Sequence, residues 1–120
     1  MSANRQGDPP PPPEPLRVDT VDSHCHLDAM DVPVADAIAA AQAVGVRRMV
    51  TVGDTMASSR WCAQTAGEHA DVYAAVAVHP NESADFTAPD VEELAKLAAL
   101  PQVRAVGETG LDYYWGRVDP

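Results

Sequence analysis

Four short apolar segments recur along the chain at almost equal spacing, and each leads into a residue suited to binding or chemistry. The segments are 18–22, 47–52, 72–78 and 103–107. The residues at their ends are separated by 29, 26 and 29 positions: His24, Gly53, His79 and Glu108. Stretches with helical signals lie between them, at 34–44, 57–69 and 87–101. Strands and helices that alternate in this way predict a parallel sheet covered by helices, and therefore an α/β fold.

The third of these helices has the clearest limits. Thr87 and Asp90 have the spacing of a capping box, and Pro89 suits the first turn of a helix. Pro101 ends the helical pattern. Between these limits, apolar residues follow at helical spacing: Val91, Leu94, Ala95 and Ala98.

The alternation is compatible with two architectures, a doubly wound sheet and a (β/α)8 barrel of the TIM type. A barrel of eight strands takes about 250 residues, whereas this chain has 120. About four βα units would therefore form the N-terminal half of such a barrel. The spacing of the segments does not choose between the two architectures.

The first sixteen residues differ in composition from the rest. Residues 1–16 hold six of the eleven prolines, including the run from Pro9 to Pro13. Such a stretch favours an extended conformation and contributes little to a core, so we predict a disordered proline-rich tail. A docking site for a proline-binding partner is the alternative. The folded domain is predicted to cover residues 17–120.

Charge and composition restrict the setting in which the protein works. No apolar run is long enough to cross a membrane, and the N-terminus has no signal-peptide pattern. Cys25 and Cys62 fit no disulfide framework or Cys-x-x-Cys metal pattern, so a cytoplasmic location is expected. The net charge of −10 argues against a broad basic face for nucleic acid. If the protein acts on DNA, a metal ion must supply much of the positive charge.

The segment His24-Cys25-His26 is the first candidate for a metal site. Side chains two apart on a strand lie on one face, about 6–7 Å apart, and two imidazoles at that spacing can reach one ion. Two surface histidines in a turn are the other interpretation. Cys25 is expected to point away from them, as a small buried apolar residue.

Three further polar residues follow later strands. Glu108 lies between two glycines and is either a metal ligand or a carboxylate in a helix cap or salt bridge. His79 is a candidate contact to a substrate phosphate or a proton shuttle, or else a structural histidine. Asp112 is interpreted as a partner of a metal-bound histidine, with a ligand or a turn residue as alternatives. No serine-nucleophile elbow or Walker phosphate loop competes with these candidates.

Three motifs of this sequence are similar, in order and spacing, to those of TatD-type deoxyribonucleases. They lie at residues 22–28, 77–80 and 105–114. The resemblance implies the N-terminal half of a (β/α)8 barrel that binds one or two divalent metal ions, such as Zn, Mg or Mn. His24 and His26 would be ligands from the first strand. Glu108 would be a catalytic residue and a ligand able to bridge two ions.

The reaction that the resemblance implies is hydrolysis of DNA phosphodiester bonds by metal-activated water. Members of the family take two further histidines and an aspartate from later strands, which this sequence does not contain. A truncated chain with little activity of its own is therefore expected.

Two rival functions remain open. The first is an amidohydrolase acting on a small cyclic amide or lactone, although no lysine ends the fourth strand. The second is a non-catalytic, truncated interaction protein. In either case, unpaired barrel edges would favour self-association.

Overall fold

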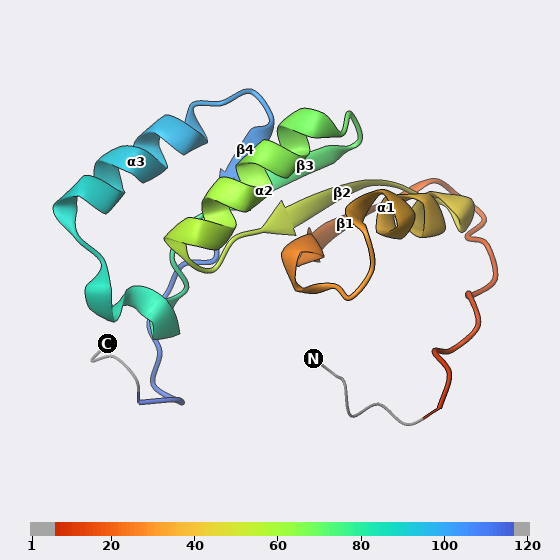
Figure 1. Cartoon of the computed structure of the whole chain (residues 1–120), viewed down its shortest axis with the longest axis horizontal. Helices are drawn as coiled ribbons and strands as arrows, with labels where there is room; N and C mark the ends of the chain where they lie inside the picture. The colour runs from red at the N-terminus through yellow and green to blue at the C-terminus, as the bar shows by residue number, and fades with distance from the viewer. Residues whose placement is uncertain (1–6, 117–120) are drawn as a thin grey trace.

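The computed structural model describes residues 7–116, in which parallel strands alternate with helices (Figure 1). None of the described helices is long and apolar enough to span a membrane. The elements in chain order are β1 (Thr20–Cys25), η1 (Leu27–Ala29), α1 (Val34–Ala43), β2 (Val46–Val52), α2 (Met56–Glu68), β3 (Val72–Val76), η2 (Pro80–Asp85), α3 (Ala88–Ala98) and β4 (Val103–Val106).

The order of the strands decides between the two expected architectures. All three strand pairs are parallel, and the order in the sheet is β1-β2-β3-β4, the same as in the sequence. A doubly wound sheet reverses its strand order at a switch point, and this sheet does not. Strands added one after another in one direction are the arrangement of the N-terminal part of a TIM barrel. The predicted fold class is therefore confirmed.

One apolar cluster holds the helices against one face of the sheet. The strand residues that join this cluster alternate along the chain, as Val72, Ala74 and Val76 do in β3. Residues of all three α-helices join the same cluster, for example Ile38, Cys62 and Leu94 from α1, α2 and α3. The three helices therefore share one face of the sheet, with α3 at the far end from α1 (Figure 1).

The opposite face carries side chains of a different kind. Arg48 in β2 and Arg104 in β4 are exposed there, and Tyr73 in β3 is half-buried. The guanidinium carbon of Arg104 lies 5.1 Å from the centroid of the Tyr73 ring. In a TIM barrel this face lines the interior.

The ends of the elements depart slightly from their predicted positions. β1 extends to Cys25, so His24 lies within the strand and not after it. β3 ends at Val76, so His79 follows the strand after a short interval. α2 begins one residue earlier than predicted, because the Ser58 backbone N–H donates to Thr55 Oγ1 (3.0 Å) and closes a capping box. In α3, the predicted cap is present: the Thr87 N–H donates to Asp90 Oδ2 at 3.0 Å.

The described part of the proline-rich segment, residues 7–16, is exposed and contains no helix or strand. Its last residue is tied to the domain, since the Leu16 N–H donates to the Val44 carbonyl at 2.8 Å. Residues 1–6 lie outside the described residues, and the disorder of the tail stays a prediction.

Candidate metal centre

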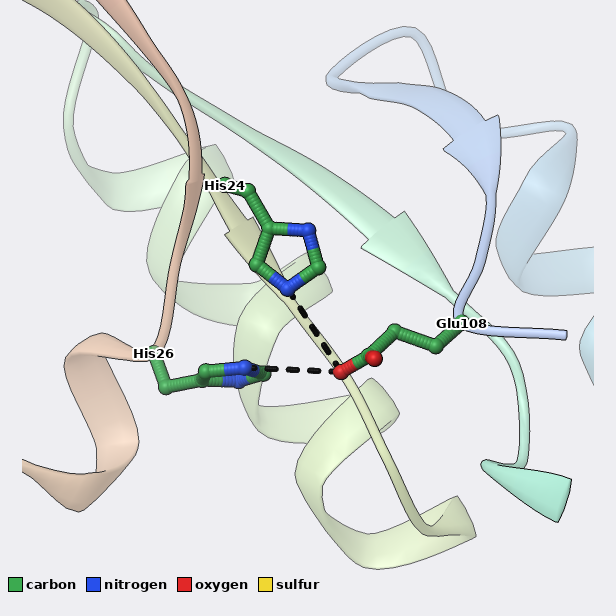
Figure 2. Close-up of side chains that lie close together, drawn as sticks. All are labelled: His24, His26 and Glu108. Carbon is green, nitrogen blue, oxygen red and sulfur yellow. Dashed lines mark ion pairs between the residues drawn. The ribbon is translucent and has the colours of Figure 1, made fainter. Parts of the chain in front are cut away.

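Three side chains meet at the carboxyl edge of the sheet: His24 near the end of β1, His26 just after it, and Glu108, two residues after β4 (Figure 2). His24 Nε2 lies 3.5 Å from Glu108 Oε2, and His26 Nε2 lies 3.4 Å from the same oxygen. One ligand atom from each of the three residues lies within 4.8 Å of the others. Two imidazole nitrogens and one carboxylate oxygen form a donor set suited to a divalent ion. The structure thus brings together the three residues predicted as ligands.

The orientation of His26 follows from a backbone carbonyl of the neighbouring strand. His26 Nδ1 lies 2.8 Å from the carbonyl oxygen of Val52. Because a carbonyl can only accept, Nδ1 must carry the proton. In the neutral ring, Nε2 then has the lone pair, and it is this atom that faces Glu108. The sequence gives no sign of this contact, because it involves a backbone atom 26 residues away.

His24 is oriented from within its own strand. Its backbone N–H donates to Asp22 Oδ1 at 3.0 Å, and the pairing of β1 with β2 is irregular between Asp22 and Cys25. The rings of His24 and His26 meet edge to face, with centroids 5.1 Å apart. Both histidines therefore point to the same side of the strand end.

Glu108 is held beyond the end of β4 by backbone contacts to β3 and to the residue that follows β2. The Gly107 N–H donates to the Val76 carbonyl (3.2 Å), and the Glu108 N–H donates to the Gly53 carbonyl (3.4 Å). Gly53 itself allows a close approach of α2, since a β-carbon there would lie 2.3 Å from Ser59 Oγ. This contact explains why a glycine stands at the end of β2.

Ser59 fixes the segment that leads to His79. Ser59 is fully buried. Its hydroxyl donates to the Ala77 carbonyl at 2.8 Å and accepts from the Ala77 N–H at 3.1 Å. The His79 N–H then donates to the Asp54 carbonyl at 2.8 Å. The sequence did not single out Ser59, because a serine inside a helix is uninformative without its partner.

His79 adjoins the three ligands but differs from them in its hydrogen bonding. Its Nδ1 accepts the backbone N–H of Asn81 at 3.1 Å. In the neutral ring the proton therefore sits on Nε2, which lies 3.6 Å from Glu108 Oε1. His79 accordingly presents a hydrogen-bond donor to the centre, whereas His26 presents a lone pair.

A cavity of about 340 Å³ opens beside the centre and is strongly acidic. Besides His26, His79 and Glu108, its lining includes three more carboxylates: Asp28, Asp54 and Glu82. Such a lining attracts cations and repels a phosphate unless a metal ion is present.

A larger hollow, of about 540 Å³, lies at the amino ends of the strands. Both of its carboxylates have partners: Arg47 Nε contacts Asp19 at 3.1 Å, and Gln42 donates to Asp71 at 2.9 Å. It contains none of the predicted site residues, and the acidic cavity is the better candidate for chemistry.

Asp112 is buried and organises the turn after β4. Its Oδ1 accepts the backbone N–H groups of Tyr114 and Trp115 at 3.0 and 3.1 Å. Its Oδ2 is buried and has no hydrogen-bond partner among the described residues. The turn contacts are those of one alternative considered for Asp112. Its role as a partner of a metal-bound histidine stays a prediction.

Cys25 lies between the two histidines but is directed away from them. Its thiol donates to the Val50 carbonyl at 3.4 Å, and the side chain packs against the apolar core. Burial raises the pKa of Cys25 to about 11. Cys25 is half-buried, and its protonated thiol is a poor metal ligand at neutral pH.

Comparison with known proteins identifies the family to which this chain belongs. The sequence model of the family described as TatD related DNase matches residues 21–120. The chain belongs to the TatD family. The matched range includes all three residues of the metal centre, His24, His26 and Glu108.

Of three curated relatives, two are named as metal-dependent hydrolases and one as an exonuclease. An uncharacterized metal-dependent hydrolase TatD from Mycobacterium tuberculosis is 46% identical over 82% of this chain. The metal-dependent hydrolase YcfH from Escherichia coli is 41% identical over 79% of it. A 3'-5' ssDNA/RNA exonuclease TatD from Escherichia coli is 32% identical over 65% of it. The chain spans 39%, 37% and 30% of the length of these three relatives.

Proposed function

We propose that this chain provides the metal-binding part of an active site that hydrolyses phosphodiester bonds in DNA. The observation that carries the proposal is the convergence of His24, His26 and Glu108 within 4.8 Å at the carboxyl edge of the sheet. Active sites of TIM barrels lie at this edge. The exonuclease name of one Escherichia coli relative supports nucleic acid as the substrate class.

The residues have distinct roles in this proposal. His24 and His26 would hold a divalent ion (zinc, magnesium or manganese), and Glu108 would be the catalytic carboxylate that completes the set. Glu108 would also be available to a second ion, because its carboxylate has one oxygen near the two histidines and the other near His79. When bound, such an ion supplies a water of lowered pKa and offsets the charge of the phosphate.

His79 contacts the substrate in this proposal. Its Nε2–H is directed toward Glu108 Oε1, at the rim of the acidic cavity, and can donate to a phosphate oxygen there. Asp112 keeps its predicted role as a support for a metal-bound histidine. Cytoplasmic location belongs to the same proposal and is supported by two cysteines that form no disulfide.

The test compares this chain with a chimera. In the chimera, the matched region of the Mycobacterium tuberculosis relative is replaced by the corresponding residues of this chain. Hydrolysis of single-stranded DNA is measured with magnesium, manganese or zinc and with a chelator. We expect metal-dependent cleavage by the chimera and little or none by the 120-residue chain. Chelator-resistant cleavage by the chimera, or full activity of its Glu108→Ala variant, would contradict the proposal.

A further inference from the structure

Three consecutive aromatic residues after the centre are exposed to solvent. Tyr113, Tyr114 and Trp115 have 78%, 83% and 58% of their surface exposed. They are half of the six aromatic residues in the chain, and we call them the aromatic segment. Tyr73, by contrast, is half-buried. Aromatic side chains normally lie in cores or interfaces, so three consecutive exposed ones are unusual.

The aromatic segment is held in a defined turn. Asp112, only 9% exposed, accepts the backbone N–H groups of Tyr114 and Trp115 through one oxygen. The rings of Tyr114 and Trp115 meet edge to face, with centroids 4.9 Å apart. A buried carboxylate thus fixes the backbone while the rings remain exposed.

The aromatic segment lies on the side of the sheet where the metal centre lies. Tyr113 is five residues beyond Glu108, so the chain between them can span at most about 18 Å. In Figure 1 the chain leaves β4 and runs past η2, and a β-carbon at Gly110 would lie 3.9 Å from Pro80 Cγ. At a rise of about 3.4 Å per nucleotide, this reach corresponds to about five nucleotides of a strand.

Because the chain is acidic, its affinity for a nucleic acid would have to come largely from the aromatic rings. The chain has a net charge of −10, and the cavity beside the centre is lined by carboxylates. Attraction between basic side chains and phosphates therefore contributes little. Stacking of bases on aromatic rings requires no positive charge and tolerates any sequence.

We propose that the aromatic segment stacks on the bases of a single-stranded nucleic acid whose backbone enters the metal centre. This inference rests on the proposed function, because it takes phosphodiester hydrolysis as the reaction at the centre. It assigns the contact with the bases to the aromatic segment, since bases are free to stack on a protein in a single strand but are already stacked on each other in a duplex.

The test measures binding of a thymidine oligonucleotide of about 12 residues to the chain by fluorescence. The chain carries Trp61→Phe, so that Trp115 is the reporter, and a chelator is present. Quenching of Trp115 is expected. Tyr113→Ala/Tyr114→Ala is expected to weaken binding at least about tenfold, and Tyr113→Phe/Tyr114→Phe to keep it within about threefold.

Two matched controls separate stacking from other contacts. An abasic strand of the same length has the same phosphates and is expected to bind at least about tenfold more weakly. Val91→Ala, which removes a 53% exposed apolar side chain from α3, is expected to leave binding unchanged. Equal binding of the abasic strand, equal binding by the double alanine variant, or the absence of quenching would each overturn the inference.

The two proposals can fail separately. The titration is performed in chelator, so it does not depend on metal binding, whereas hydrolysis by the chimera requires the metal. Quenching by a proline-rich peptide and not by the oligonucleotide would assign the aromatic segment to protein binding instead.

Discussion

Replacing Glu108 by glutamine tests the metal centre directly, because it removes one charge while keeping the shape of the side chain. The Nε2 atoms of His24 and His26 lie 3.5 and 3.4 Å from one oxygen of this carboxylate. At a ligand distance of about 2.1 Å, attraction between a carboxylate and a divalent ion is about 4 kcal/mol even at the dielectric constant of water. An amide oxygen retains part of this attraction. We therefore expect Glu108→Gln to weaken metal binding at least about 100-fold.

Isothermal titration with zinc and with manganese measures this loss, and circular dichroism confirms that the variant is folded. Asp54→Asn is the matched control, because Asp54 lines the same cavity but its carboxylate accepts from Ser58 Oγ at 2.6 Å. Asp54 is not among the three residues whose ligand atoms converge, so the control is expected to lose less than about tenfold. The reasoning is refuted if Glu108→Gln binds within about threefold of wild type, or if Asp54→Asn loses as much.

Three other predictions concern the chain as a folded unit. The unpaired edges of β1 and β4 are expected to make the chain self-associate; a monodisperse monomer with a cooperative melt in light scattering and calorimetry would contradict this. Ser59→Ala leaves the buried N–H and carbonyl of Ala77 without their partner, and urea denaturation is expected to show a loss of about 2–4 kcal/mol, against at most about 1 kcal/mol for Ser83→Ala. Burial raises the pKa of Cys25 and of Cys62 from 9.0 to about 11. Thiol labelling at pH 8 is therefore expected to be slow until urea is added, and fast labelling of the folded chain would contradict the burial of the thiols. Because the folded state holds these protons more tightly, the free energy of unfolding is expected to be highest below pH 9 and to fall as the pH approaches 11.

The spacing of apolar segments was enough to predict the elements, because each βα unit is a local pattern of hydrophobicity. It could not give the order of the strands, which depends on pairing between segments far apart in the sequence. β1 beside β2 and β3 beside β4 became known only from the structure. The start of α2 was missed because Thr55 pairs with a serine at the third helical position, where the usual signal is an acidic residue or glutamine.

The ligands of the candidate site were predictable because their residue types are specific to metal chemistry. The groups that orient these ligands were not predictable. The Val52 carbonyl determines which nitrogen of His26 faces the centre, and the Asn81 N–H does the same for His79. Backbone groups are identical at every position, so the sequence cannot reveal which of them lies beside a given ring.

The exposed face of the sheet restricts what can complete it. Arg48 and Arg104 stand where the interior of a TIM barrel would be, and a guanidinium buried there without a counter-charge costs several kcal/mol. Any polypeptide that closes this barrel must therefore bring acceptors opposite both arginines, preferably carboxylates in a bidentate arrangement. An interior lined only by aliphatic side chains would be rejected on electrostatic grounds, however well its shape fitted. In a closed barrel, the two arginines would therefore favour acidic side chains opposite them over aliphatic ones.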